Sequence, residues 1–274
     1  MLMYGPFDSQ PFDNYRVSSL EVAEGKYSKK KRLTLVLSSP HQSENHCSIN
    51  DLIDKDTCSM SYIKIDDAID IILKYGRNSW LCKYDISNAF KYCPITPSQW
   101  PTFCVKWNSL YYFYVRLIFG CRSSPIKFDT LSQAICYIAN NNYKVNNSLH
   151  LLDDFLTIDP PRADGERSMA LLMMIFKRLN VPIAMHKTVG PVMCHEYLGI
   201  ILDTQKMEAR LPQEKIDRIC DFIFKLHKRS SCTKREILQL PGHLNSASPV
   251  ILPGRSFVSY LIKLSTIVCN ILYT

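Results

Sequence analysis

The chain has 274 residues, and 46% of them are hydrophobic, which suffices for one or two folded domains and excludes an unstructured tail. A formal net charge of +8 and a pI of about 8.9 favour an anionic partner, with nucleic acid ahead of an acidic membrane surface. Eleven cysteines without a Cys-x-x-Cys pair argue against a disulfide framework and a structural zinc site, so we expect an intracellular protein with reduced thiols, in the nucleus or the cytoplasm.

The N-terminal part is predicted to form an arm, a basic cluster and a strand. Residues 1–25 are rich in turn signals and aromatic residues, which indicates an extended arm pinned by its aromatic side chains. A basic cluster at 26–32 runs into an apolar strand at 33–37. A charged run of this kind is usually a solvated loop. The functional alternative is a cradle for phosphate groups, which Lys and Arg bind by charge and forked hydrogen bonds.

A helix and a buried strand follow. Residues 65–75 are predicted as a short helix, with Asp66 as its N-cap and Gly76 just past its end. Residues 79–86 are predicted as a buried strand that ends at an acid, Asp85.

The next segment combines an aromatic hairpin with a longer helix. A short helix is predicted to start within 87–91. Alternating apolar strands at 102–107 and 110–117 are joined through Asn108-Ser109, and a turn at 119–125 leads into a helix. Helical spacing predicts one buried face on that helix, formed by Phe128, Leu131, Ile135 and Ile138.

Two adjacent acids, Asp153 and Asp154, separate two short apolar runs at 148–152 and 155–158. This pattern is typical of a tight β-hairpin with the acids at its tip. Neighbouring carboxylates repel each other unless a cation or a basic group lies beside them. Asp is also a common turn residue, so this stretch alone leaves both interpretations open.

The C-terminal part is predicted to be basic and largely helical. A helix at 164–180 is followed by a hairpin of 197–202 with 207–211. An apolar stripe at helical spacing then indicates a buried helix face, formed by Ile216, Ile219, Cys220, Ile223 and Leu226. From residue 206 onward eleven Lys and Arg outnumber five Asp and Glu, which suits contact with a phosphate backbone. The apolar segment 257–273 is too short for a membrane span, so we expect no membrane contact.

The order of the central elements predicts where the acids meet. Strand, helix, hairpin, helix and a last strand near Lys187 give the β-α-β-β-α-β order of a ferredoxin-like sheet, with the aromatic hairpin as an insertion. The first strand then lies beside the third, which brings Asp85 close to Asp153 and Asp154. Three carboxylates suit two divalent metals about 3.5–4 Å apart, the arrangement used for phosphoryl transfer. Oxygen ligands favour Mg²⁺.

An ordered set of motifs over nearly the whole chain resembles the motifs of reverse transcriptases. The N-terminal motifs are Gly5-Pro6-Phe7, Lys30-Lys31-Arg32-Leu33 and Ile49-Asn50-Asp51. The central and C-terminal motifs are Tyr84-Asp85-Ile86-Ser87-Asn88-Ala89-Phe90, Phe119-Gly120-Cys121-Arg122-Ser123-Ser124-Pro125, Leu151-Leu152-Asp153-Asp154, His186-Lys187 and Glu196-Tyr197-Leu198-Gly199. The chain further resembles the DIRS type of retrotransposon, the tyrosine-recombinase elements, through Leu152-Asp153-Asp154-Phe155-Leu156, Ser123-Ser124-Pro125 and Pro253-Gly254-Arg255.

This resemblance implies an α+β fold, a right-hand polymerase with a ferredoxin-like palm, partial fingers and a helical thumb. The fingers would span 1–79, the palm 80–205 with an inserted fingers hairpin near 102–117, and the truncated thumb and start of the connection 206–274. The implied activity is that of an RNA-directed DNA polymerase, which transfers a nucleotide from a dNTP to a primer 3′-hydroxyl on an RNA or DNA template. RNase H and recombinase regions are not recognised in the sequence, so we expect a fragment or a decayed copy.

The resemblance also implies roles for single residues at the acid cluster. Asp85, Asp153 and Asp154 would be catalytic and would hold two Mg²⁺ ions, with Mn²⁺ as a substitute. The backbone carbonyl of Ile86 would assist them.

Five further residues are implied to bind the nucleotide. Lys30 and Arg32 would hold the triphosphate, and Lys187 would stabilise or protonate the leaving pyrophosphate. Phe90 would lie under the sugar and exclude a 2′-hydroxyl, and Gly120 would let the backbone approach the nucleotide. Without the resemblance, Phe90 would be interpreted as a core aromatic residue and Lys187 as a surface cation.

Two other functions remain open at this point. One is a different palm polymerase, such as an RNA-dependent RNA polymerase, against which the bulk of Phe90 argues. The other is a catalytically inactive nucleic-acid-binding remnant of a decayed element, in which the basic C-terminal helices persist and the acids are turn residues.

Overall fold

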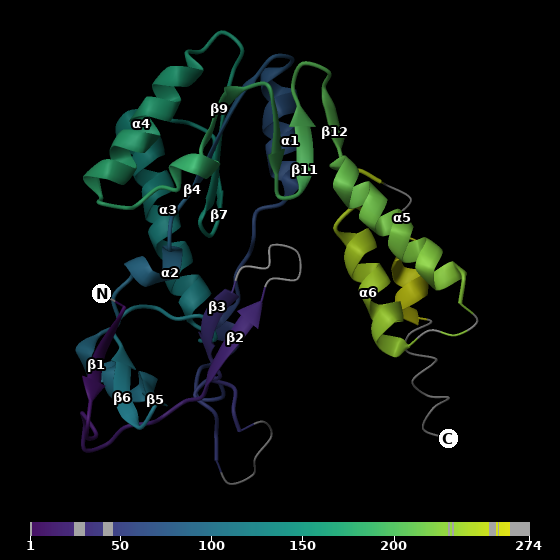
Figure 1. Ribbon diagram of the computed structural model, residues 1–274. Helices are drawn as coiled ribbons and strands as arrows, with labels where there is room; N and C mark the ends of the chain where they lie inside the picture. The colour runs from purple at the N-terminus through teal and green to yellow at the C-terminus, as the bar shows by residue number, and fades with distance from the viewer. Residues whose placement is uncertain are drawn as a thin grey trace. The chain divides into compact units, whose positions relative to one another are not determined.

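The computed structural model describes most of the chain (Figure 1), namely residues 2–24, 31–40, 46–229, 231, 233–251, 256 and 258–263. Lys30 and the Pro253-Gly254-Arg255 motif lie outside the described residues, as does most of the apolar segment 257–273. Among the helices that are described, none combines the length and the apolar character needed to cross a membrane.

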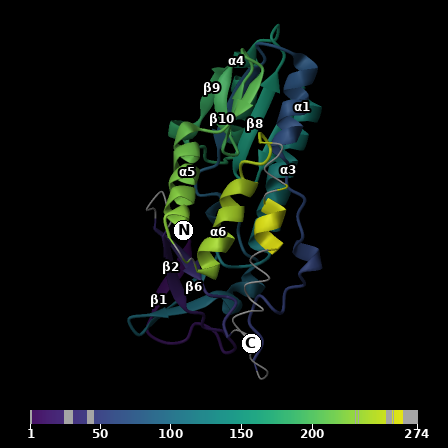
Figure 2. The ribbon, with the colours of Figure 1, turned by 90° about the vertical axis from the view of Figure 1, so that its right-hand side faces the viewer.

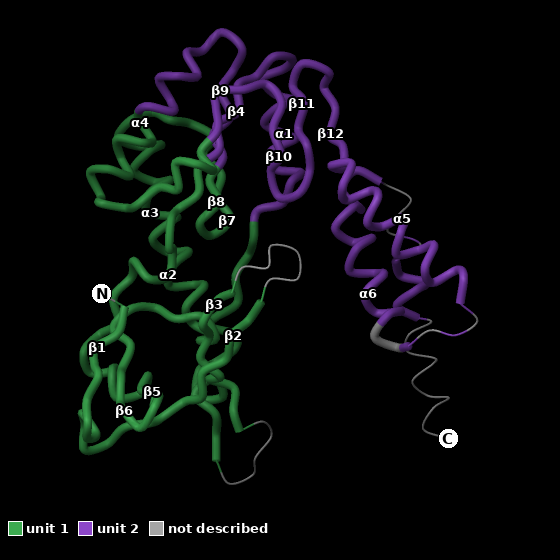
Figure 3. Tube along the Cα trace, viewed as in Figure 1, with its two compact units in different colours: residues 1–62, 84–155, 171–188 green, residues 63–83, 156–170, 189–274 purple. Residues whose placement is uncertain are grey.

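The chain divides into two compact units (Figure 3). Unit 1 comprises Met1–Tyr62, Tyr84–Phe155 and Leu171–Thr188. Unit 2 comprises Ile63–Lys83, Leu156–Ala170 and Val189–Thr274. The expected fingers, palm and thumb boundaries stay a prediction.

A four-stranded sheet has the strand order β7-β8-β4-β9. Its strands are β4 (Trp80–Asp85), β7 (Ser148–Leu151), β8 (Asp154–Asp159) and β9 (Val189–Val192). The helices that alternate with them along the chain are α3 (Ser124–Tyr143) and α4 (Gly165–Arg178). The predicted β-α-β-β-α-β order is confirmed, and the first strand, β4, lies beside the third, β8.

Burial explains why these segments form strands and a helix. Leu81, Cys82 and Tyr84 of β4 are almost fully buried. Strand β8 is buried from its second residue to its last, so its apolar run packs on both faces. Helix α3 buries Phe128 and Ile135 as predicted. It presents Ser132 and Ala139 to the core in place of Leu131 and Ile138, which are only partly buried.

Unit 1 holds a three-stranded sheet of order β1-β6-β5. Its strands are β1 (Met3–Phe7), β6 (Leu110–Tyr114) and β5 (Cys104–Trp107). The predicted arm is confirmed, because the rings of Phe7 and Phe12 pack on Phe113 at 5.7 and 4.9 Å between centroids. The turn Asn108-Ser109 has positive φ at both residues, which suits the twist of a two-residue hairpin.

A two-stranded ribbon, also in unit 1, pairs β2 (Leu20–Glu24) with β3 (Lys31–Leu35). The predicted strand at 33–37 is thus shifted towards the basic cluster, with Glu24 opposite Lys31. The rest of unit 1 contains α2 (Ala89–Tyr92) and three 3₁₀ segments, η1 (Asp56–Cys58), η2 (Pro97–Phe103) and η3 (Met185–Lys187). Segment η2 occupies the start of the strand that was predicted from residue 102, because Pro97 and Pro101 favour a tight helical turn there.

Helix α1 of unit 2 has the predicted bounds, Ile65–Tyr75. Asp66 is not its N-cap, which corrects the prediction. Lys64 is the cap residue, and its backbone N–H donates to the carboxylate of Asp67 at 2.7 Å. Asp66 already lies in the first helical turn, whereas Asp67 at the third helical position can reach back to the free amide. Gly76 ends the helix with φ of 89°.

Another three-stranded sheet of unit 2 has the order β10-β11-β12. Its strands are β10 (Cys194–Tyr197), β11 (Ile200–Asp203) and β12 (Glu208–Arg210). The predicted hairpin forms between β11 and β12, but its first strand begins at Ile200 and not at Tyr197. Leu198 and Gly199 both have positive φ, 49° and 76°, and turn the chain back on itself between β10 and β11.

Unit 2 also contains α5 (Gln213–His227) and α6 (Lys234–Asn245), which run side by side (Figures 1 and 2). The predicted buried stripe of α5 is only partly confirmed. Ile219 is buried, but Ile216 and Ile223 are 36% and 42% exposed. One neighbouring helix covers only a narrow stripe of another, so the outer members of the stripe remain accessible.

Candidate active site

The end of β4 and the tip of the β7–β8 hairpin are joined directly. The backbone N–H of Ile86 donates to the carbonyl of Asp153 at 2.9 Å. The tip itself is tight, because Leu152 has φ of 55° and its carbonyl accepts a hydrogen bond from the hydroxyl of Ser132 at 2.8 Å. The two segments that carry Asp85 and Asp153 are therefore brought together by backbone bonding.

A third segment completes this end of the site. The N–H of Ala184 donates to the carbonyl of Asp85 at 2.8 Å, which places η3 along the end of β4. The amino group of Lys187 then lies 2.8 Å from Oδ2 of Asp85. The Asp85 side chain is 15% exposed and the Lys187 side chain 50%, so the amino group reaches the acid from the solvent side.

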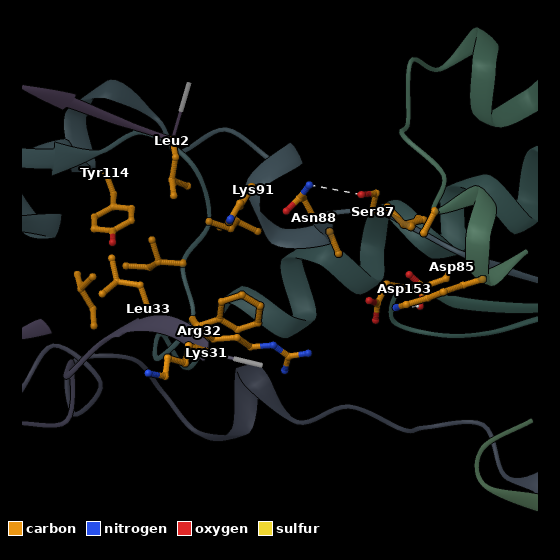
Figure 4. Close-up of a pocket in the computed structure, with 18 of the residues that line it drawn as sticks. Leu2, Lys31, Arg32, Leu33, Asp85, Ser87, Asn88, Lys91, Tyr114 and Asp153 are labelled. Carbon is orange, nitrogen blue, oxygen red and sulfur yellow. Dashed lines mark hydrogen bonds and ion pairs between the residues drawn. The ribbon is translucent and has the colours of Figure 1, made fainter. Parts of the chain in front are cut away.

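A cavity of about 450 Å³ opens at these residues (Figure 4). Asp85 and Asp153 lie together at one end, and Leu2 and Tyr114 lie at the other (Figure 4). Cationic side chains contribute to the wall, namely Lys31, Arg32, Lys91 and Lys187. A polyanion with an apolar portion suits such a lining, because cations hold phosphates while the apolar end excludes water.

The acids of the cavity repel each other. Burial raises the pKa of the Asp153 carboxyl, and the adjacent charge of Asp85 raises it further. Lys187 and Arg32 oppose this rise by favouring the ionised form. The carboxylates of Asp85 and Asp153 and the carbonyl of Ile86 are all oxygen donors, the type that Mg²⁺ prefers. Across the described part of the chain, no three His, Cys, Asp or Glu side chains converge as a ready metal cage.

The predicted site residues divide into three groups. Asp85, Asp153, Ile86, Arg32 and Lys187 all line the cavity. Asp154, Phe90 and Gly120 do not belong to its lining. Lys30 lies outside the described residues.

Asp154 is separated from Asp153 by the geometry of the hairpin. It is the first residue of β8, while Asp153 belongs to the turn. Successive side chains along a strand point to opposite faces, so neighbouring acids need not face the same space.

Phe90 packs behind the wall of the cavity. Its ring lies 4.9 Å from that of Phe119, which lines the cavity, and 5.7 Å from that of the buried Phe128. The guanidinium of Arg32 lies 5.7 Å from the centre of the Phe119 ring. Of this pair of rings, Phe119 is therefore the one that lines the cavity, with Phe90 supporting it.

Two features of the site were not predicted as such. The motif at 119–125 implies no role for Phe119, although this residue directly precedes Gly120. Lys91 lines the cavity and directly follows Phe90. A cation beside a motif on a short helix is the only sequence signal for Lys91, and it is a weak one.

Comparison with known proteins adds to this geometry. No protein-family model matches the sequence, and no curated protein matches it. Among solved structures, a foamy viral protease-reverse transcriptase dRH in complex with double-stranded DNA superposes with a TM-score of 0.65. It is 17% identical and covers 91% of this chain and 40% of its own.

The chain has a reverse-transcriptase-like fold. The foamy viral protease-reverse transcriptase in complex with an RNA/DNA hybrid gives a TM-score of 0.61 at 16% identity, over 94% of this chain and 31% of that chain. The same protein with double-stranded DNA gives 0.59 at 17% identity, over 94% of this chain and 53% of that one. This chain thus spans between about a third and a half of the length of these proteins, and at such identity the likeness concerns the fold.

Proposed function

We propose that the chain is an RNA-directed DNA polymerase domain of a retrotransposon of the DIRS type. The observation that carries the proposal is the cavity of unit 1, which is lined by an acid at the end of β4, an acid at the tip of the β7–β8 hairpin, and cationic side chains from the β2–β3 ribbon and from η3. The three solved structures compared above are complexes with DNA or an RNA/DNA hybrid, which supports a template-primer as partner.

The residues of the cavity suit nucleotidyl transfer. Asp85 and Asp153, with the carbonyl of Ile86, would hold Mg²⁺, which activates an attacking hydroxyl and neutralises the leaving phosphates. Asp154 would complete this set as a further ligand. Arg32, together with Lys30 and the neighbouring Lys31, would bind the triphosphate of a dNTP through charge and forked hydrogen bonds.

Lys187 and the aromatic wall take the remaining roles. Lys187 can carry a proton to the leaving pyrophosphate, since its amino group already lies beside Asp85. Gly120 would let the backbone of its turn approach the nucleotide next to Phe119, although Gly120 itself lies outside the lining of the cavity. Phe119 and Phe90 form a bulky wall that would exclude a 2′-hydroxyl.

Primer extension on an RNA template with Mg²⁺ tests the proposal. The wild-type protein should extend the primer with dNTPs. Asp153→Asn should lower the rate by roughly a hundredfold or more, because it removes a charge that the transition state requires. Asp159→Asn is the matched control, since this acid at the far end of β8 accepts a hydrogen bond from Ser168 at 2.9 Å and does not line the cavity. Equal loss in both variants would contradict the assigned role.

A binding-only function is the second candidate. It is favoured by the position of Asp154, which does not join Asp85 and Asp153 in the cavity lining. A wild-type protein that binds the template-primer tightly and never extends it would establish this alternative. Equal use of rNTPs and dNTPs would instead favour an RNA polymerase and remove the role given to Phe90.

A further inference from the structure

Asn50 is a polar side chain in the core of unit 1, only 5% exposed. Its amide group bonds to two other stretches of chain. Nδ2 donates to the hydroxyl of Ser38 and to the carbonyl of Gly120, both at 2.8 Å, and Oδ1 accepts from the N–H of Arg122 at 2.9 Å. Both amide protons and the carbonyl oxygen are therefore used, which is the arrangement that makes a buried Asn tolerable.

The side chain of Arg122 bonds in turn to the loop that carries Asn50. Its Nη1 donates to the carbonyl of Asn50 and, at 2.8 Å, to the carbonyl of Ile53. The loop at 50–53 and the turn at 119–122 are thus bound to each other by side chains from both sides. We call Asn50 and Arg122 the clamp.

The turn that the clamp holds has little support of its own. Gly120 has φ of 100°, and a Cβ at this position would overlap the carbonyl oxygen of Leu35. The turn also meets β3 through the N–H of Leu35, which donates to the carbonyl of Phe119 at 3.2 Å. Glycine is the most flexible residue, so a turn centred on it needs outside contacts to keep one conformation.

The position of this turn decides the position of the cavity wall. Phe119 lines the cavity, Phe90 packs against its ring, and Arg32 lies over it. A shift of the turn would move the aromatic wall and withdraw support from the Arg32 side chain. Asn50 does not line the cavity itself, so its effect passes through Phe119.

We propose that Asn50 and Arg122 are positioning residues that set the affinity of the cavity for the nucleotide by fixing Phe119. The inference rests on the proposed polymerase function. On this view the buried side chain of Asn50, which is distant in sequence from the acids, controls substrate binding. It does not control the chemical step.

Steady-state primer extension with Asn50→Ala separates these effects. KM for the dNTP should rise about tenfold, because the turn loses the bonds that hold it, while kcat should stay within about threefold. Asp54→Asn is the matched control, since this exposed acid directly after the loop accepts a hydrogen bond from the N–H of Asp56 at 3.0 Å. It should leave KM unchanged.

Two additional variants keep the test decisive if Asn50→Ala folds poorly. Asn50→Asp keeps an acceptor for Arg122 and can accept from the Ser38 hydroxyl, but it places an oxygen against the carbonyl of Gly120. It should raise KM as well. In a Phe119→Leu background, Asn50→Ala should have little further effect on KM, because the clamp acts through that ring.

Hydrogen exchange of the amides of Leu35 and Arg122 tests the clamp without catalysis. Asn50→Ala should accelerate both, and Asp54→Asn should not. Unchanged KM, a fall in kcat at constant KM, or full additivity with Phe119→Leu would overturn the inference. If the wild-type protein never extends a primer, the polymerase function fails, and unchanged exchange at both amides would then overturn the clamp as well.

Discussion

Asp153 and Asp203 show how differently this chain treats two largely buried carboxyl groups. Burial raises the pKa of Asp153 despite the cations nearby. The pKa of Asp203 is lowered, first by the backbone N–H of Lys206 at 3.0 Å and then by the Arg210 guanidinium at 3.0 Å. The fold supplies hydrogen-bond donors to the Asp203 carboxylate, so this group has a structural role. At Asp153 the nearby cations do not fully offset the electrostatic cost of burial, which fits the ligand-binding role proposed for this acid.

The lowered pKa of Asp203 predicts a pH-dependent contribution to stability. An acid with a depressed pKa stabilises the fold above its ordinary pKa of 3.8, and this contribution is lost as the pH falls towards the lowered value. Asp203→Asn should therefore reduce Tm clearly at pH 7 and much less near pH 3. Thermal unfolding followed by circular dichroism at both pH values measures the difference.

The control for this prediction is Asp221→Asn, which changes an exposed acid on helix α5. It should alter Tm little at either pH. A Tm difference for Asp203→Asn that is as large at pH 3 as at pH 7 would mean that the side chain acts through packing, not through its charge.

The sequence anticipates which residues gather at the site better than it anticipates which way they face. Asp85, Asp153 and Lys187 meet because the strand order brings their segments together. Asp154 and Phe90 carry the same motif signal as their neighbours yet do not line the cavity. One residue along a strand reverses the side-chain direction, and one residue along a helix such as α2 turns it by about 100°, so a motif does not record which way each side chain faces. For Asn50 the sequence offers only a motif, because two of its three partners, Gly120 and Arg122, lie 70 and 72 residues away.

Elements whose ends carry a local signal were predicted well. Helix α1 begins where the Asp67 carboxylate caps the backbone N–H of Lys64, and it ends at Gly76. Both ends are therefore set by nearby residues. The turn between β10 and β11 was missed because Leu198 adopts positive φ. A branched apolar residue rarely does so, and the usual Asn-Gly signal does not stand there. That conformation is imposed by the pairing of the two strands.

Two glycines of unit 2 separate the effect of helix propensity from that of backbone conformation. Gly242 lies inside α6, and Gly76 ends α1 with φ of 89°. A Cβ would meet no described atom within 4 Å at either position. Gly242→Ala should raise the free energy of unfolding by about 0.5–1 kcal/mol, because Ala loses less backbone entropy in a helix. Gly76→Ala should lower it, because an L residue is strained at that φ.

Urea denaturation of both variants checks this pair. The expected shifts of the midpoint have opposite signs although the added methyl group is the same. A destabilising Gly242→Ala would show that α6 is distorted near its interior Pro241, which already removes one helical hydrogen bond.

For the whole molecule, the net charge of +8 is the quantity most directly tied to a nucleic-acid partner. Its excess lies from residue 206 onward, as the sequence alone indicates. The count of charges treats all cations of this segment as equal, whereas the structure shows that they differ in their ion pairing. Arg229 donates to the carboxylate of Glu236 at 2.7 Å, while its neighbour Lys228, at the end of α5, is exposed. The paired guanidinium is already neutralised by a partner, so the two cations should not contribute equally to phosphate binding.

This difference is measurable as a change in the salt dependence of template-primer binding. Each phosphate that a cation neutralises adds about 0.9 to the slope of log affinity against log salt concentration. Lys228→Gln should lower that slope by about one, measured by fluorescence anisotropy with an RNA/DNA hybrid between 50 and 200 mM salt, a range in which such slopes are resolved. Arg229→Gln removes the same formal charge and is the matched control, expected to change the slope less. Equal changes in both variants would show that binding responds to the total charge of the chain, and not to cations placed singly against the phosphates.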